Sequence, residues 1–596
     1  MATYKAPLRD MRFVLNELHG GEALPQLPGL EEMTPDVVGS VLEEAARVCE
    51  EVLFPLNRSG DEAGCSFENG IVRTPAGFPE AYRTFREGGW TSIACDPAYG
   101  GQGLPHAVAS LIDEMISSAN LSFGLYPGLS YGAYVALHAF GSAALKDKYL
   151  PKLVEGVWSG TMCLTEPHCG TDLRLLRTKA APQSDGSYRI SGTKIFISAG
   201  EHDLTENILH LVLARLPHTP PTIDGISLFL VPKFLVRDDG SPGARNGVAC
   251  GSIEHKMGIK ASATCVINFD NAAGWLVGEP NKGMRAMFAM MNTERLAVGI
   301  QGLGLAEASY QGAVAYARER LQGRASSGAR YPDRPADPII VHPDVRRMLL
   351  TQRAYIEGCR ALGGWVAQAL DEQQHHPEPD RRAAAGDLVA LLTPTVKALF
   401  TDLGFEATNL GMQVLGGHGY IREQGMEQYV RDCRIAQIYE GTNGVQALDL
   451  VGRKLPAHGG RLLQRFFLPI GDFLAKTAGD PELAPFTGPL AKALTHLSQA
   501  TDRIINAGTV DPEEPGAAAS DYLRLFGLTA LAYMWARAAE VALRKLRDGA
   551  DDEQFYKAKL GTARFFTERL LPETGGLLAA IMAGGRSMME FDEAAL

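Results

Sequence analysis

Residues 162–172, MCLTEPHCGTD, mark the point at which the pattern of this chain changes. Before this stretch apolar residues recur at the spacing of helices, and after it short alternating runs predict strands. Thr-Glu-Pro followed by a glycine and a hydroxyl residue directs hydroxyl and backbone N–H groups to one place. Such a surface can hydrogen-bond the carbonyls and ring nitrogens of a flat heterocycle. An ordinary strand followed by a turn has the same local pattern, so both interpretations stay open for this stretch alone.

Helices are predicted on the N-terminal side of this stretch. Residues 35–48 carry apolar side chains at helical spacing, and residues 111–116 and 133–140 are similar. The loop at residues 96–103, DPAYGGQG, separates two of these segments. We therefore predict an N-terminal helical domain over residues 1–160.

A β-rich middle domain is predicted over residues 161–281. Short runs there are rich in β-branched and aromatic residues and are bounded by turn residues, which is typical of strands. These runs are residues 188–192, 194–198, 208–214, 226–231 and 264–269.

Helical patterns return after the strands and continue to the end of the chain. They are clearest over residues 295–319, 345–370, 383–410 and 521–547. A Pro/Gly break at residues 456–460 divides them, so we predict one helical domain over residues 282–455 and a helical extension over residues 456–596. His375 and His376 lack acidic or cysteine partners at ligand spacing, which favours a solvated loop over a metal site.

The composition is that of a soluble globular enzyme. The chain has 596 residues, of which 45% are apolar and 21% charged, and its net charge of −12 disfavours a general nucleic-acid binder. No run of 18 apolar residues and no secretory signal is present, so no integral membrane segment is expected. The nine cysteines lack paired short spacings, which argues against a disulfide framework or a zinc site and indicates a reducing cytoplasm.

A second informative stretch is IYEGTN at residues 438–443. Glu440 follows an apolar residue and an aromatic one, and Gly441 follows it. A carboxylate beside apolar walls loses hydration, so its pKa rises toward the range that suits a general base. Taken alone, this stretch is more often an ordinary helix end. The chain has neither a Gly-x-Gly-x-x-Gly turn in a βαβ unit nor a Walker A motif, so a nucleotide cofactor would be held in another way.

Four segments together resemble the acyl-CoA dehydrogenase family in order and spacing, over roughly residues 40–455. They are MCLTEPHCGTD at 162–172, GTKIFIS at 192–198, QVLGGHG at 413–419 and YEGT at 439–442. The resemblance implies an α+β fold with an N-terminal helical domain, a middle β-barrel-like domain and a C-terminal four-helix bundle, here with an extra helical C-terminal domain. The extension and the opening YKAP at residues 4–7 resemble a longer bacterial branch described as 3-methylmercaptopropionyl-CoA dehydrogenase-like.

The resemblance also assigns expected roles to individual residues, with FAD as the cofactor. Thr165 would hydrogen-bond the flavin ring, Phe196 would cover one side of it, and Ser198 would contact its reactive nitrogen. Arg320 would reach the pyrophosphate of the FAD bound to a neighbouring subunit. The full set of expected FAD contacts is Leu164, Thr165, Gly170, Thr171, Phe196, Ser198, Arg320, Gln413, Gly416, Gly417 and Thr442. The expected substrate contacts are Thr171, Glu294, Arg295 and Gly441, and no metal ligand is expected.

The chemistry implied by the resemblance is α,β-dehydrogenation of an acyl-CoA thioester to a trans-2-enoyl-CoA. Glu440 would take the α-proton while the β-hydrogen leaves as hydride to the flavin, and the electrons would pass to an electron-transfer flavoprotein. Some relatives carry the base on an earlier helix in a Glu-Arg pair, so Glu294, followed by Arg295, is a second candidate. At residues 443–444 this chain has Asn-Gly where Ser-Gln is frequent, so a cofactor contact by that glutamine is not expected here.

Several alternatives stay open at this stage. The substrate is either 3-methylmercaptopropionyl-CoA or a fatty acyl-CoA. An acyl-CoA oxidase would let oxygen reach the reduced flavin. A DNA-associated adaptive-response flavoprotein of the same fold would need a basic C-terminal face, whereas residues 456–596 are slightly acidic. The extension is expected to occupy the surface through which compact relatives form tetramers, which predicts a homodimer.

Overall fold

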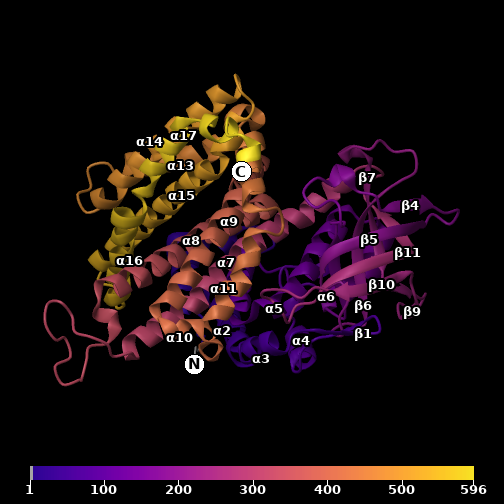
Figure 1. Cartoon of the computed structure of the whole chain (residues 1–596), viewed down its shortest axis with the longest axis horizontal. Coiled ribbons are helices and arrows are strands. Elements are labelled where there is room, and N and C mark those ends of the chain that lie inside the picture. The colour runs from indigo at the N-terminus through magenta and orange to yellow at the C-terminus, as the bar shows by residue number, and fades with distance from the viewer. Residues whose placement is uncertain (1–3) are drawn as a thin grey trace. The chain divides into compact units, whose positions relative to one another are not determined.

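The computed structural model describes residues 4–596, and its internal contacts divide the chain into two compact units (Figure 1). Of the described residues, the helical unit comprises residues 4–44, His106–Glu114 and Val298–Leu596, and the sheet unit comprises Ala45–Pro105 and Met115–Ala297. The N-terminal segment and the extension both belong to the helical unit, together with the helices that follow residue 298.

The helices before residue 160 confirm that this region is mainly helical, as predicted. The helices of this region are α1 (Leu8–Arg12), α2 (Pro35–Val48), α3 (Pro55–Ala63), α4 (Phe78–Glu87), α5 (His106–Phe140) and α6 (Ala143–Glu155). The structure adds one hairpin that the sequence interpretation missed, formed by β1 (Ser66–Glu68) and β2 (Ile71–Arg73). Its turn residues Asn69 and Gly70 both have positive φ, and Asn-Gly between two strands was the signal for it.

The middle of the chain forms a seven-stranded sheet that closes on itself. Its strands are β3 (Trp158–Cys163), β4 (Lys179–Pro182), β5 (Tyr188–Ser198), β6 (Asn207–Arg215), β7 (Ile226–Pro232), β10 (Val248–Ile253) and β11 (Thr264–Val277). Strand β7 pairs with both β6 and β11, so the ring β11-β5-β4-β6-β7 is complete. Closure removes two free edges and confirms the predicted barrel-like domain. A separate hairpin joins β8 (Phe234–Val236) to β9 (Pro242–Arg245).

Apolar side chains fill the interior of this ring, among them Ile190, Val212 and Phe229, each fully buried. Two runs predicted as separate strands, 188–192 and 194–198, are one strand, β5. The reason is that β11 pairs along the whole of it, from Gly274 opposite Tyr188 to Thr264 opposite Ser198.

Three long helices form most of the predicted helical bundle. They are α7 (Gly283–Glu319), α8 (Pro343–His375) and α9 (Pro379–Val414). The short helices α11 (Met426–Arg434) and α12 (Asn443–Asp449) pack on α9, and α10 (Gly417–Tyr420) follows it directly. Within the helical unit α7 and α9 approach closely, since a Cβ on Gly404 would lie 2.4 Å from the carbonyl oxygen of Gly302. Glycine at both positions allows this crossing.

The extension is helical, as predicted, and packs on the bundle. Its helices are α13 (Arg461–Lys476), α14 (Ala484–Gly508), α15 (Glu514–Arg547), α16 (Glu553–Phe565), α17 (Glu573–Ala583) and α18 (Arg586–Met589). The indole N–H of Trp535 on α15 donates to the Ala354 carbonyl of α8 at 3.2 Å, and both residues are buried. The extension therefore shares a core with the bundle.

Buried charges tie the N-terminal helix to the extension. The Arg360 guanidinium pairs with Asp10, with Glu114 and, at 2.6 Å, with Glu307. Lys559 on α16 pairs with the same Asp10, and both of these side chains are at most about a tenth exposed. Breaking one such buried pair leaves an uncompensated charge, which is strongly destabilising.

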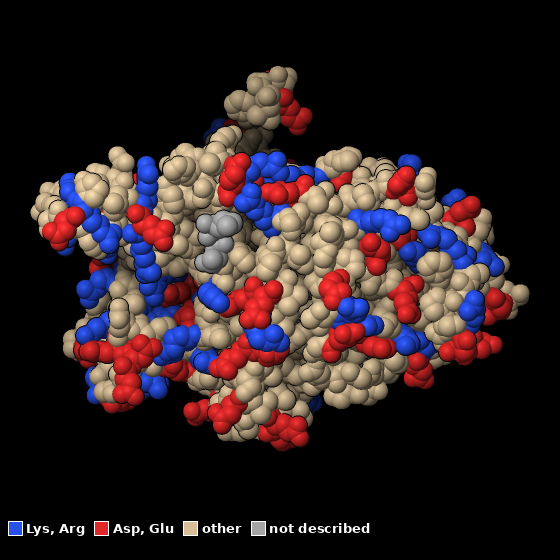
Figure 2. Space-filling model, turned by 90° about the horizontal axis from the view of Figure 1, so that it is seen from below, with Lys and Arg blue, Asp and Glu red and all other residues tan. Residues whose placement is uncertain are grey.

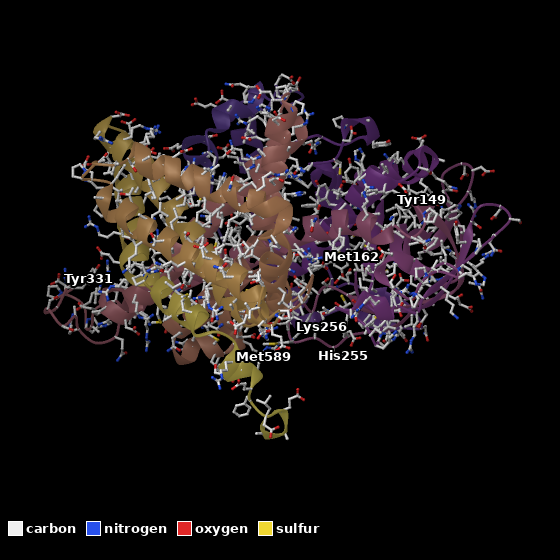
Figure 3. All side chains as sticks on the ribbon, turned by 90° about the horizontal axis from the view of Figure 1, so that it is seen from above. Tyr149, Met162, His255, Lys256, Tyr331 and Met589 are labelled. Carbon is white, nitrogen blue, oxygen red and sulfur yellow. The ribbon has the colours of Figure 1, made fainter. Side chains whose placement is uncertain are left out.

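Two further surface features concern single parts of the chain. The segment between α7 and α8 contains Tyr331 and extends away from the helices of its unit (Figure 3). On the face shown in Figure 2, Lys and Arg side chains are interspersed with Asp and Glu side chains.

Among the described residues α9 alone is long and apolar enough to span a membrane, but 78% of its most apolar window is buried, as in the core helix of a globular protein.

Candidate active site

The end of strand β3 carries the first predicted flavin contacts, in the sheet unit. The backbone N–H of Ile195 donates to the Thr165 carbonyl at 2.9 Å, and Lys194 Nζ donates to the Leu164 carbonyl at 2.8 Å. These bonds hold Leu164 and Thr165 beside β5. Gly170 lies in the exposed turn that follows, and a Cβ on it would be 3.6 Å from Thr165 Cγ2, which leaves its other side open.

A buried ion pair between Lys194 and Glu166 holds this loop in place. Lys194 Nζ lies 2.9 Å from Glu166 Oε1, and the two side chains are 0% and 3% exposed. Glu166 also accepts the Thr178 hydroxyl at 2.6 Å and the N–H groups of Arg177 and Thr178 at 2.8 and 3.0 Å. Burial acts to raise the pKa of Glu166, but the Lys194 charge and these hydrogen bonds outweigh it and hold the pKa below its usual value. Sequence reasoning missed this pair, although a lysine directly before the apolar run IFI (residues 195–197) of a strand was a signal for it.

Phe196 and Ser198 lie near the far end of β5. Phe196 has φ of 57° and is 59% exposed, and Ser198 is opposite Thr264 of β11. A left-handed phenylalanine is unusual in a strand. It leaves a large aromatic ring uncovered, as a residue that packs against a flat ring requires.

Glu294 and Arg295 are buried on α7, within the part of that helix that belongs to the sheet unit. A Cβ on Gly132 would lie 2.3 Å from Glu294 Oε1 and 3.1 Å from two carbons of Met290. Helix α5 therefore packs tightly against the Glu294 carboxyl. Arg295 donates to Asn292 on its own helix at 3.3 Å. Glu294 therefore lies in the closely packed contact between α5 and α7.

The predicted base lies in the helical unit, in the turn before α12. Glu440 has φ of 57° and Gly441 has φ of 81°, so two consecutive residues are left-handed. The Thr442 hydroxyl accepts the Val445 N–H at 3.2 Å and caps α12. The Tyr439 hydroxyl donates to Gln301 of α7. The half-buried Glu440 carboxyl is thus carried by a tight, strained turn, which sequence patterns did not predict.

Thr171 is exposed beside Gly170 in the sheet unit, whereas Arg320, Gln413, Gly416 and Gly417 belong to the helical unit. Gly416 and Gly417, exposed at the start of α10, have no atom within 4 Å of the position of a Cβ. The Tyr316 hydroxyl and His418 Nδ1 lie 2.7 Å apart, which brings the end of α7 next to this turn. Arg320 follows Tyr316 by one helical turn and is exposed. Sequence reasoning assigned no role to Tyr316 or to His418, although His418 lies within the motif at residues 413–419. Gln413, also exposed, precedes this turn.

These features fit FAD. The open backbone at Gly416 and Gly417 admits close approach of a ligand, and an exposed arginine suits a pyrophosphate. In the sheet unit, the exposed Phe196 ring and the open turn at Gly170 suit a flat ring. The structure brings the predicted residues together as separate sets within each of the two units.

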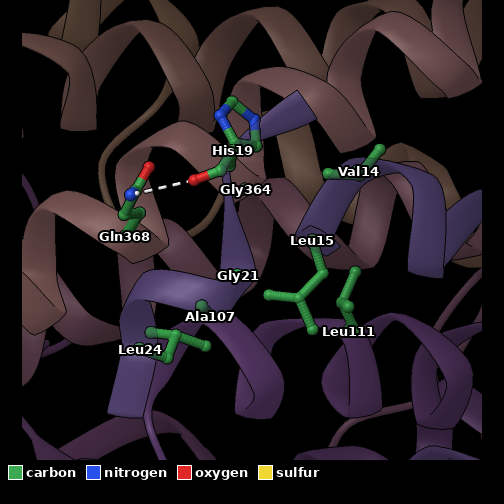
Figure 4. Close-up of a pocket in the computed structure, with 9 residues that line it drawn as sticks. All are labelled: Val14, Leu15, His19, Gly21, Leu24, Ala107, Leu111, Gly364 and Gln368. Atoms are coloured by element: carbon green, nitrogen blue, oxygen red, sulfur yellow. Dashed lines mark hydrogen bonds between the residues drawn. The ribbon is translucent and has the colours of Figure 1, made fainter. Parts of the chain in front are cut away.

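Two other features of the described residues resemble ligand sites. Ligand atoms of Glu166, His168 and Cys169 lie within 4.8 Å of one another, but Glu166 is already held by Lys194 and Thr178. In the helical unit a cavity of about 10 Å³ has the lining shown in Figure 4, and His19 Nδ1 beside it has no hydrogen-bond partner. This volume admits about one water molecule, so the cavity cannot hold an acyl-CoA.

The chain belongs to the acyl-CoA dehydrogenase family, whose cofactor is FAD. The family's domain models match in order: the N-terminal domain at residues 40–157, the middle domain at 161–272 and the C-terminal domain at 281–455. A further model, acetyl-CoA dehydrogenase C-terminal like, matches residues 466–592 of the extension. The resemblance seen in the sequence is thereby confirmed, and the protein is an oxidoreductase of the acyl-CoA dehydrogenase class.

Particular relatives extend this comparison over the whole chain. The chain is 43% identical to 3-methylmercaptopropionyl-CoA dehydrogenase of Ruegeria pomeroyi, over 98% of this chain and 99% of that protein. It is 34% identical to a butyryl-CoA dehydrogenase of Syntrophomonas wolfei, over 99% of each. The crystal structure of an acyl-CoA dehydrogenase complexed with FAD from Bacillus anthracis has the same fold, with a TM-score of 0.73, 20% identity, and coverage of 96% of this chain and 91% of that one.

Proposed function

We propose that this acyl-CoA dehydrogenase oxidises short acyl-CoA thioesters with Glu440 as the α-proton base, and passes the electrons to an electron-transfer flavoprotein. The observation that carries the assignment of the base is the turn at Glu440. A strained, left-handed glutamate persists only where the surrounding structure holds it, and such residues cluster at active sites. Glu294, by contrast, is packed against Gly132 within the sheet unit.

The residues would divide the chemistry as follows. The Glu440 carboxylate takes the proton from the α-carbon of the thioester and holds it on a carboxyl oxygen. Bound FAD supplies the acceptor for the hydride that leaves the β-carbon. The backbone N–H of Glu440 is a donor for the thioester oxygen, where negative charge develops as the α-proton leaves. In the sheet unit, Thr165 and Ser198 would hold the flavin ring, and Phe196 would cover it.

A short acyl chain is proposed because the two relatives of full length named above act, by their names, on 3-methylmercaptopropionyl-CoA and butyryl-CoA. We further propose a homodimer, since the Arg320 assignment requires FAD bound to a second copy. A cytoplasmic location is proposed because the nine cysteines lack paired short spacings.

Glu440→Gln tests the base directly, with Glu294→Gln as the matched control. Both changes remove one carboxylate and keep the shape of the side chain. Anaerobic addition of butyryl-CoA should bleach the flavin absorbance of the Glu294→Gln protein, whereas Glu440→Gln should keep its FAD and lose bleaching by about 10³-fold or more. Bleaching that survives in Glu440→Gln and is lost in Glu294→Gln would reverse the assignment.

The electron acceptor and the substrate need separate measurements. Steady-state turnover with an electron-transfer flavoprotein, compared with peroxide release under air, distinguishes a dehydrogenase from an oxidase. Rates of flavin bleaching with 3-methylmercaptopropionyl-CoA, butyryl-CoA and longer straight-chain acyl-CoAs rank the substrates. Faster bleaching by chains of twelve or more carbons would overturn the short-chain proposal.

A further inference from the structure

The turn that carries Glu440 is closed by a carboxylate on the neighbouring helix α9. Asp402 Oδ1 accepts the side-chain amide of Gln437 at 2.6 Å and the side-chain amide of Asn443 at 2.7 Å. Gln437 precedes Glu440 by three residues and Asn443 follows it by three. One oxygen therefore fastens both ends of the turn to the same point on a long helix.

Asn443 also connects this carboxylate to a buried cation. Lys397 Nζ donates to Asn443 Oδ1 at 2.8 Å, and Lys397 is 0% exposed. The Thr401 hydroxyl lies 2.9 Å from Asn443 Nδ2, and the Ala398 carbonyl lies 3.2 Å from it. The amide oxygen thus faces the ammonium and the amide nitrogen faces the carboxylate. The two opposite charges orient the amide, because the flipped orientation would place its NH₂ against the ammonium and its oxygen against the carboxylate.

The base needs this support for a physical reason. A non-glycine residue in the left-handed region costs of order 1–3 kcal/mol and persists only if its surroundings hold it. Inside the turn, Gln446 Nε2 donates to the carbonyls of Glu440 and Gly441 at 3.3 and 3.2 Å, which are long bonds. The short bonds to Asp402 lie outside them, at both ends of the turn.

We propose that Asp402, Asn443 and Lys397 are positioning residues that set the direction of the Glu440 carboxylate. This inference rests on the proposed role of Glu440 as the base. None of the three is assigned a contact with substrate or flavin, so their effect passes through the backbone of residues 437–443. Rates of proton transfer depend steeply on alignment, and a misplacement of about 1 Å can cost about 100-fold.

The first test compares Asn443→Ala with the unaltered holoenzyme. We expect flavin bleaching by butyryl-CoA to slow by about 100-fold while FAD content is retained. Bleaching with α-deuterated butyryl-CoA should show a larger isotope effect than in the unaltered enzyme, because a misaligned base makes proton removal more rate-limiting. Tyr522→Phe is the control. It removes a buried 2.7 Å hydrogen bond to Thr501 in the extension and should lower stability without changing the isotope effect.

The second test exchanges the two partners. Asn443→Asp places two carboxylates against each other, and Asp402→Asn removes the charge that orients the amide, so each single change should slow bleaching. The combined variant restores an amide beside a carboxylate, keeps an acceptor for Lys397 and keeps the net charge. Its rate of flavin bleaching should be about tenfold higher than that of either single variant. This factor corresponds to the free energy of one hydrogen bond to a charged group.

The outcomes separate this inference from the proposed function. If Glu440→Gln loses bleaching while Asn443→Ala keeps the full rate, or loses rate only in proportion to lost FAD, the positioning role is wrong and the base assignment stands. A combined exchange variant no faster than the slower single variant also overturns the positioning role. If Glu440→Gln bleaches normally, both the base assignment and the positioning role fail.

Discussion

Removing the Lys194 charge tests how the loop that carries Leu164 and Thr165 is supported. In Lys194→Met the Glu166 carboxylate stays buried but loses its cation, and the Leu164 carbonyl loses a donor at 2.8 Å. Breaking a buried pair in this way costs about 3–5 kcal/mol. At about 2–4 °C per kcal/mol for a unit of this size, the sheet unit should melt about 6–20 °C lower. Flavin release should accompany melting, since the loop that carries Leu164 and Thr165 loses its support.

The structure also predicts how this loss depends on pH and on its partner. Without the lysine charge, burial raises the pKa of Glu166, so the carboxyl protonates at moderately low pH and its unpaired charge disappears. The loss of melting temperature in Lys194→Met should therefore be smaller at pH 5 than at pH 8. Lys194→Met combined with Glu166→Gln should recover most of the loss, because the amide oxygen still accepts from Thr178.

Thermal melting followed by flavin fluorescence, with FAD content measured at each temperature, checks these expectations. A single variant that melts within about 2 °C of the unaltered protein would refute the role of the ion pair. So would a double variant as unstable as Lys194→Met, since the cost would then not arise from a buried unpaired charge.

Other predictions concern buried groups in each unit. Burial, with the Arg360 charge opposing it, raises the pKa of Glu114 from 4.5 to about 7. The folded state then binds more protons than the unfolded one between these values, so the helical unit should lose about 3 kcal/mol as pH rises through this range, and Glu114→Gln should flatten the melting profile against pH. In the sheet unit, Gly132→Ala would place a methyl group 2.3 Å from Glu294 Oε1 and should destabilise by about 1–3 kcal/mol, measured by melting with FAD loaded. An unchanged melting temperature would mean that Glu294 can move away freely.

Much of the fold followed from the sequence because its signals are periodic. Apolar spacing predicted helices that the structure places within α7, α8, α9 and α15, and alternation predicted strands within β5, β6, β7 and β11. The β1-β2 hairpin was not predicted, although Asn69-Gly70 is typical of a hairpin turn. The reason is that apolar residues at helical spacing surround it on both sides. The closure of the sheet by β7 was implied only by the family resemblance, since strand pairing depends on contacts between distant residues that periodicity does not encode.

The candidate site was predictable to a lesser degree. Motif residues such as Thr165, Gly416 and Glu440 were predicted as site residues because each lies in a short run that resembles the family. Lys397 was not found, because a lysine in a helix sequence looks solvated until its burial is known. Asp402 was missed for a similar reason, since its partners Gln437 and Asn443 lie far along the chain.

The link between Asp10 and Lys559 has a consequence for how the protein is made. These partners are 549 residues apart in the chain. At about 5–20 residues per second, roughly 30–110 s pass between the synthesis of the two. The sheet unit is fully synthesised once Ala297 has emerged, whereas the helical unit waits for α16. Asp10 can pair with Arg360, 350 residues away, before α16 is made, so this buried charge cluster is completed only once Lys559 has been synthesised.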